Sequence, residues 1–92
     1  MTEQSYRATA ASNGYGDPME KSLAPDTYNA HHVHDVALYL YILEGEMSLD
    51  IDGPEGLKET TCRPGETVEV LKDVLHTERA GPQGCRFLVA RR

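Results

Sequence analysis

The sequence predicts an all-β protein with a single domain, and two observations lead to this prediction. Short apolar stretches recur from residue 27 onward, and turns rich in glycine and proline separate them. No stretch has the apolar spacing of an amphipathic helix. A chain of 92 residues has the size of one small domain, and several short strands with this turn spacing are typical of a sandwich or a barrel.

Residues 1–25 are predicted to form an N-terminal arm that is mostly loop. Their apolar content is low, and glycines and prolines interrupt them repeatedly. Two short pieces, 6–8 and 22–24, have a composition that can add a strand to the edge of a sheet. The predicted β domain therefore comprises residues 26–92.

Seven strands are predicted after the arm. They span residues 27–32, 34–43, 46–52, 57–62, 67–70, 75–80 and 86–91. The segments 44–45, 52–56, 63–65 and 81–84 are predicted turns, because each contains residues suited to a positive or a fixed φ. Residues 46–52 alternate polar and apolar side chains, which is the pattern of a half-buried strand.

The segment 34–43 is apolar on both faces. Side chains alternate along a strand, so one face carries His32, His34, Val36, Leu38, Leu40 and Ile42, and the other carries Ala37, Tyr39, Tyr41 and Leu43. A strand of this kind is usually buried on both sides, so the second face needs a cover, either the N-terminal arm or a second subunit. We expect a homodimer through the Tyr39/Tyr41 face, because exposed patches rich in tyrosine commonly mark interfaces.

Composition limits the partners and the compartment. Acidic residues outnumber basic ones by 15 to 9, for a net charge of −6, which disfavours a nucleic-acid partner. No run of 18 apolar residues predicts a membrane span, and the N-terminal residues lack the apolar core of a signal peptide, so we expect a cytoplasmic protein. The two cysteines, Cys62 and Cys85, are too few for a disulfide framework and are expected to be small buried side chains.

Three histidines form the one cluster with recognisable chemistry. His32 and His34 are two residues apart, so a strand would present both imidazoles on one face, which is half of a metal site. His76 is the candidate for the third ligand, whereas His31 has the opposite parity and is expected to point away. Imidazole suits zinc, iron, copper and nickel alike, so the pattern predicts a divalent metal, Fe, Zn, Ni, Mn or Cu, without choosing one.

The segment around the first two histidines resembles the first motif of the cupin superfamily, a group of small jelly-roll β-barrels. That motif reads Gly, five residues, His-x-His, three or four residues, Glu, six residues, Gly. His32, His34 and the closing Gly45 match it in register. Asp26 replaces the opening glycine, and Leu38 replaces the glutamate.

The second cupin motif reads Gly, five residues, Pro-x-Gly, two residues, His, three residues, Asn. Gly65 and His76 match it in register, while Leu71, Asp73 and Ala80 replace its proline, second glycine and asparagine. Aspartate tolerates a left-handed backbone better than most residues, so the turn at Asp73 can survive. The resemblance implies a cupin-like jelly-roll barrel over residues 26–92, made of two facing antiparallel sheets.

The resemblance also implies a metal-dependent enzyme acting on a small molecule. Without a carboxylate at Leu38, three neutral imidazoles would leave the ion its full charge and an open position, which makes a stronger Lewis acid. Three-histidine cupin-like sites include thiol and diketone dioxygenases, and oxygenase, isomerase and lyase chemistry all remain open. Glu78 is a possible substitute ligand, although we expect it instead to be solvated or to contact a ligand without binding the metal. No catalytic residue is identified.

Two further readings stay open beside the enzyme. One is a non-catalytic barrel that binds or senses a small ligand, and the other is a metal-free barrel whose histidines are remnants of the motif. In the enzyme, Leu38, Leu40 and Ile42 are expected to form an apolar pocket wall. Parity places Tyr28 at the mouth of the site, and Asp35 is expected to face solvent.

Overall fold

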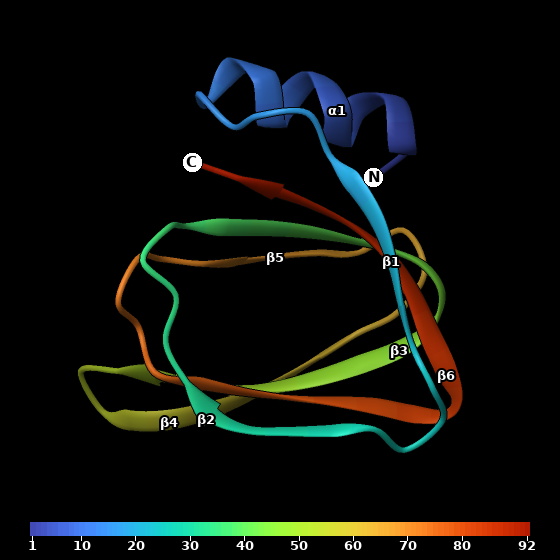
Figure 1. Cartoon of the computed structure of the whole chain (residues 1–92). Helices are drawn as coiled ribbons and strands as arrows, with labels where there is room; N and C mark the ends of the chain where they lie inside the picture. Colours follow the sequence, from blue (N-terminus) through green and yellow to red (C-terminus); the bar gives the residue numbers. More distant parts are fainter.

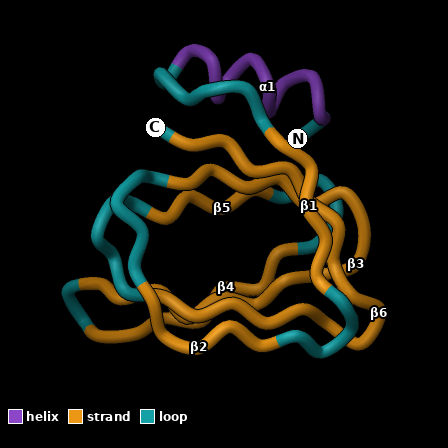
Figure 2. The backbone as a smooth tube through the Cα atoms, viewed as in Figure 1, coloured by secondary structure: helices purple, strands orange, loops and turns teal.

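The computed structural model describes all residues, 1–92, as one helix and six strands. These are α1 (Glu3–Ser12), β1 (Met19–Leu23), β2 (Tyr28–His32), β3 (Leu38–Gly53), β4 (Gly56–Cys62), β5 (Thr67–Val70) and β6 (His76–Arg91). The strands form two facing layers that enclose an interior, and the helix lies over one layer (Figures 1 and 2). The predicted all-β jelly-roll barrel is confirmed.

The two long strands, β3 and β6, take part in both layers. The first half of β3 pairs with β5 and with the second half of β6, which also pairs with β1. These strands form the upper sheet, beneath α1 in Figure 1. The second half of β3 pairs with β4 and with the first half of β6, which also pairs with β2. These form the lower sheet, and every pairing in both sheets is antiparallel.

Two of the predicted turns are bends within long strands. Residues 44–45 lie inside β3 and residues 81–84 lie inside β6, so the prediction that strands end there was wrong. The β3–β6 register shifts on both sides of Gly45, and such bulges bend a strand sharply without ending it. Gly45 has φ +74°, and a Cβ atom there would lie 2.0 Å from the carbonyl oxygen of Gly84.

The core lies between the two sheets, on the inner faces of the strands. Leu38, Leu40 and Ile42 are at most 6% exposed and belong to this core, with Val36 packed against it. The parity predicted for this face is therefore confirmed. Cys62 and Cys85 are buried in the same core, as expected, and burial raises the pKa of the Cys85 thiol to about 11.

The N-terminal arm contains a helix, so the prediction that no helix exists was wrong. Thr2 caps α1: its side chain accepts a hydrogen bond from the Ser5 backbone N–H, and the Ser5 side chain bonds back to Thr2. Tyr6 and Ala10, four residues apart, form the buried stripe of the helix. Of the two predicted edge pieces, 6–8 lies in α1, whereas 22–24 overlaps the edge strand β1.

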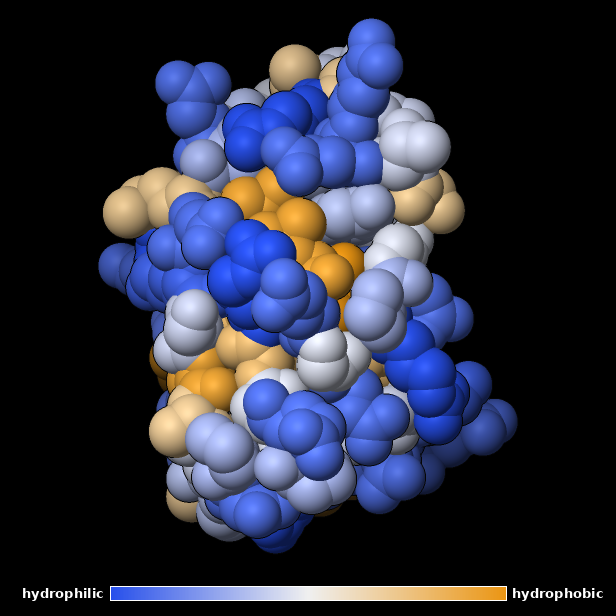
Figure 3. Space-filling model, turned by 90° about the vertical axis from the view of Figure 1, so that its right-hand side faces the viewer, coloured by the Kyte–Doolittle hydropathy of each residue, from blue (hydrophilic) through white to orange (hydrophobic).

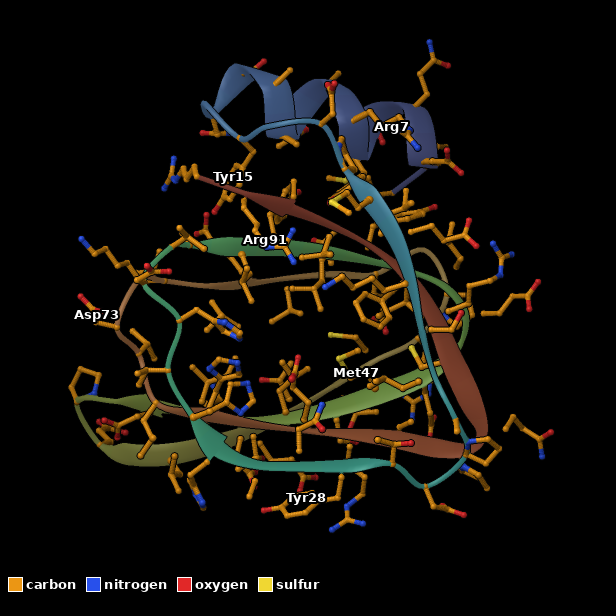
Figure 4. The ribbon with its side chains drawn as sticks, in the orientation of Figure 1. Arg7, Tyr15, Tyr28, Met47, Asp73 and Arg91 are labelled. Carbon is orange, nitrogen blue, oxygen red and sulfur yellow. The ribbon has the colours of Figure 1, made fainter.

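The helix covers the outer face of the upper sheet. The Tyr6 ring packs against Tyr41 and Tyr39, with ring centroids 5.2 and 4.9 Å away, and the Tyr6 hydroxyl donates to the Tyr39 carbonyl at 2.7 Å. Tyr15 lies between α1 and the sheet (Figure 4), beside Ala37. Of the two predicted covers, the arm is the one observed.

This cover removes the surface through which we expected a dimer. Tyr41 is only 7% exposed within a single chain, so the Tyr39/Tyr41 face is already covered, whereas the homodimer itself stays a prediction. A side view shows a mostly hydrophilic surface with hydrophobic residues in small areas below the helix (Figure 3). No helix combines the length and hydrophobicity needed to cross a membrane.

We predict that Gly45→Ala destabilises the fold more than Gly56→Ala does. Both glycines have positive φ, but a Cβ at Gly56 meets nothing within 4 Å, so its alanine costs only backbone strain of about 1–2 kcal/mol. The clash at Gly45 should add about 1–3 kcal/mol. Urea unfolding measures both values, and equal losses would contradict the close approach.

We also predict that the Tyr6 hydroxyl makes stability depend on alkaline pH. Burial, as the largest cause, raises the pKa of Tyr6 to about 12 from 10.0. The stabilisation from holding this phenol neutral is complete below pH 10 and is lost as the pH rises toward 12. Tyr6→Phe should cost about 1 kcal/mol at pH 7, and its deficit relative to the native chain should shrink above pH 10. A deficit that is constant with pH would contradict the assignment.

Candidate metal centre

The three predicted histidines come from two neighbouring strands and the loop between β2 and β3. His32 ends β2 and His76 begins β6, and the two are paired directly across the lower sheet. His34 lies two residues beyond β2, where its carbonyl accepts a hydrogen bond from the Asp73 N–H at 2.9 Å. Asp73 has φ +62°, as expected for an aspartate in the glycine position of the turn. This bond joins the loop that carries His34 to the turn before His76.

The structure brings the three imidazoles together. One ring nitrogen from each of His32, His34 and His76 lies within 4.8 Å of those of the other two. The ring centroids are 4.2 Å apart for His32 and His76, 4.9 Å for His32 and His34, and 5.2 Å for His34 and His76. His31 is exposed and takes no part in the cluster, in agreement with its parity.

Backbone carbonyls orient two of the three rings. Nδ1 of His32 lies 2.7 Å from the Ala30 carbonyl, and Nδ1 of His76 lies 3.1 Å from the Val74 carbonyl. Because a carbonyl oxygen only accepts, each Nδ1 carries the proton and donates it. Each Nε2 therefore keeps a lone pair, which is how protein imidazoles are commonly oriented toward a metal.

His76 carries a polar atom without any partner. Its side chain is fully buried, and Nε2 is the only buried side-chain nitrogen or oxygen in the protein that lacks a hydrogen bond. Leaving such an atom unsatisfied costs about 1–3 kcal/mol. A lone pair that faces two other imidazoles and finds no donor fits a cation between the three rings.

His34 is held in the form that can bind a metal. Burial lowers the pKa of His34, and the neighbouring His32 and His76 lower it further. The effect favours the neutral imidazole, which is the form that ligates a metal ion.

Glu78 lies beside the histidines; of the two positions expected for it, solvated or in contact with a ligand, the structure shows the second. Its side chain is 13% exposed, and its Oε1 lies 3.3 Å from Nε2 of His32 and 3.4 Å from Nδ2 of Asn29. Both nitrogens of His32 thus face acceptors, Ala30 and Glu78, whereas a neutral imidazole has only one N–H. A cation between the His32 ring and the carboxylate would remove this conflict, so these residues fit a metal.

A cavity of about 170 Å³ opens beside this cluster. His34 and Glu78 line it, and Leu38 and Leu40 form part of its apolar wall, as predicted. Ile42, the third residue predicted for this wall, is buried in the core and does not line the cavity.

The prediction for Tyr28 was wrong. Tyr28 is 47% exposed and points away from the interior (Figure 4). A register shift between Asn29 and His32 breaks the parity of β2, so Asn29 lines the cavity instead. Asp35, by contrast, is exposed as expected.

Sequence reasoning missed six residues that line the cavity. They are Lys21, Leu23, Asn29, Phe87, Val89 and Arg91. Residues 87–90 are a continuous apolar run, so the sequence predicts a strand buried on both faces there without indicating that the side with Phe87 faces inward. Nothing in the sequence alone places Lys21 there, because its side of β1 is set by pairing with residues 85–89 of β6.

Comparison with known proteins identifies the fold. No family model matches the chain, and no curated protein matches it. Among solved structures, oxalate decarboxylase from Bacillus subtilis at pH 4.6 superposes with a TM-score of 0.73 over 80% of this chain, at 20% identity. An RmlC-like cupin from Shewanella frigidimarina superposes with a TM-score of 0.68 over 82% of this chain and 63% of its own, at 19% identity. The fold is that of the cupin superfamily.

Two further matches show how widely this cupin fold is shared. A formate complex of oxalate decarboxylase from Lactobacillus farciminis has a TM-score of 0.71 at 23% identity and covers 78% of this chain. Drosophila melanogaster CENP-C bound to CAL1 has the same TM-score at 14% identity and covers 79%. The chain spans only about a fifth of the length of the oxalate decarboxylases, 20% and 22%. At these identities the likeness establishes the fold alone.

Proposed function

We propose that this cupin is a metal-dependent enzyme that acts on a small molecule, with His32, His34 and His76 holding a divalent ion. The observation that carries the proposal is the partnerless, buried Nε2 of His76, directed at two other imidazoles beside a cavity. A site that served only packing would satisfy or expose that nitrogen. The ion remains open among Fe, Zn, Ni, Mn and Cu.

The comparisons support a divalent metal in this fold. The oxalate decarboxylase of Bacillus subtilis, one of the matched structures, contains Mn(II) centres. Its cupin fold superposes on 78% of this chain with a TM-score of 0.71. This supports manganese as one candidate, while three imidazole donors suit the other metals equally.

The protein's own residues would prepare the cavity for chemistry. A divalent ion in such a site supplies Lewis-acid character, polarising an oxygen of the bound molecule. Leu38 and Leu40 line the cavity with apolar surface, which excludes water and strengthens electrostatic interactions there. Glu78 is the only carboxylate that lines the cavity, so it is the candidate to accept a proton from the bound molecule. Oxygenase, isomerase and lyase reactions fit this arrangement.

The carboxylate near the histidines comes from a different position in the sequence than the glutamate of the first cupin motif. Leu38 stands where the first motif has its glutamate, and it forms part of the cavity wall. Glu78 enters instead from β6, two residues beyond His76 on the same face, and reaches His32. We propose that Glu78 supplies the negative charge that balances the ion, as a direct ligand or through His32.

The alternative is a non-catalytic barrel that binds or senses a small ligand. The match to Drosophila melanogaster CENP-C bound to CAL1 supports a binding role for this fold in general, because that complex names CAL1 and no small molecule. Oxygen uptake by the iron-loaded protein separates the two: consumption supports an oxygenase, and its absence with every small molecule tried favours the binding role or redox-neutral chemistry.

We predict that His34→Ala abolishes metal retention while the β fold stays intact. The variant removes one of the three proposed ligands, the partly buried imidazole of His34. The loop that carries it stays held by backbone hydrogen bonds. The measurement is elemental analysis of protein purified without a nickel column, with circular dichroism to verify the fold. His31→Ala is the matched control and should retain the metal. Unchanged metal content in His34→Ala would refute the site.

We predict that Glu78→Gln weakens metal binding by about tenfold to a hundredfold, the usual effect of removing a group that supports a ligand. Glutamine keeps the size of the side chain and loses its charge. Competition with a fluorescent zinc chelator measures the affinity. Glu59→Gln, an exposed position on β4, is the control and should bind normally. Equal affinities in the two variants would exclude Glu78 from the site.

A further inference from the structure

The cavity beside the histidines has two cations among its lining residues, Lys21 and Arg91. Both occupy inward-facing positions of the upper sheet. Arg91 is paired with Leu38, and Lys21 is paired with Phe87. Directly paired residues in antiparallel strands share a face, and Leu38 and Phe87 belong to the core. Figure 4 shows Arg91 extending from β6 toward the space between the sheets. Both side chains are exposed and line the cavity from its upper side.

Neither cation has a carboxylate partner. Four other arginines form ion pairs: Arg7, Arg63, Arg86 and Arg92. Arg79 stacks on the Tyr28 ring at 4.6 Å. Arg91 contacts only the Met19 sulfur, at 3.6 Å, and Lys21 forms no ion pair or side-chain hydrogen bond. Lys58 and Lys72 also form no ion pair, so the lack of a partner alone is not distinctive. The gathering of two unpaired cations at one cavity, in a chain with six more acidic than basic residues, points to an anion that binds there.

The opposite side of the cavity carries an imidazole and a carboxylate instead of cations. His34 and Glu78 reach it from the β2–β3 loop and the lower sheet, while Lys21 and Arg91 reach it from the upper sheet. A bound anionic group would be repelled by Glu78 and attracted by the two cations. The charges therefore orient a ligand, with its anionic group toward Arg91 and its remainder toward His34.

The size and the walls of the cavity restrict the ligand further. A cavity of about 150 Å³ holds one benzene molecule, so the 170 Å³ here holds a molecule with a short carbon skeleton. The apolar lining is Leu23, Leu38, Leu40, Phe87 and Val89. An inorganic anion would leave this apolar surface unused. A small organic acid uses both the cations and the apolar wall.

We infer that the cavity binds a small organic carboxylate, with Arg91 and Lys21 anchoring its carboxylate group and the apolar wall contacting its carbon skeleton. This inference rests on the proposed function for the role of the metal, but the anion site itself is formed by residues that are not metal ligands. It names the class of substrate that the proposed enzyme takes.

The test is an NMR titration with butyrate and with butyramide, its neutral amide of the same size, followed through backbone amide shifts near the cavity. Butyrate should bind at least about tenfold more tightly than butyramide, because hydrogen bonds to charged groups are worth about 1.5–3 kcal/mol. Arg91→Gln should weaken butyrate binding by about tenfold and leave butyramide unchanged. Lys21→Gln should have the same effect in a smaller degree.

Arg79→Gln is the matched control, since Arg79 lies on the outer side of the lower sheet beside Tyr28. Its butyrate affinity should equal that of the native chain. Equal affinity for butyrate and butyramide, or no effect of Arg91→Gln in a variant with native-like spectra, would overturn the inference. Inorganic phosphate binding as tightly as butyrate would also overturn it, because the site would then recognise charge alone.

Titrating both chelator-treated and zinc-loaded protein separates this inference from the proposed function. Arg91-dependent butyrate binding without any zinc retention supports the carboxylate site and refutes the metal site. Butyrate binding that requires zinc and ignores Arg91→Gln shows an anion on the metal alone, which overturns the anchoring role and keeps the metal site.

Discussion

The pairing of β3 with β6 along almost their whole length is the constraint on which the rest of the structure depends. Both strands bend where Gly45 and Gly84 approach each other, and the bend lets one strand pair contribute to two facing sheets. One end of the pairing sets Ile51 opposite His76, and the other sets Leu38 opposite Arg91. The same ladder therefore delivers an imidazole to one side of the cavity and a guanidinium to the other.

Several polar side chains lie close together in and beside the interior of this small barrel. The fully buried His76 lies beside the partly buried His34 and Glu78, and the exposed cations Lys21 and Arg91 line the same cavity as His34 and Glu78. Isolated polar groups in such a setting are unfavourable unless a partner compensates them. The metal and the carboxylate that we propose are those partners: one satisfies the lone pair of His76, and the other neutralises the unpaired cations.

The helix extends the core to the outer face of the barrel. Tyr6, Tyr15 and Ala10 bury the side of β3 that carries Tyr39 and Tyr41, together with Leu88 and Ala90 of β6. Without this layer, the upper sheet would expose an apolar face of a size that usually marks an interface. The helix thus stabilises the sheet that holds Arg91 and Lys21, and none of its own residues line the cavity.

The sequence by itself determined the β architecture, the inner face of 36–42 and the trio of histidines, because alternation along a strand and the spacing of motif residues are local properties. It did not determine α1, since the buried stripe of a ten-residue helix is only Tyr6 and Ala10. Tertiary structure decided which side chains point inward wherever a bulge or a long-range strand pairing sets the orientation. The shift after Asn29 turned Tyr28 outward, and the β1–β6 register turned Lys21 inward, because a one-residue slip moves a side chain to the opposite face.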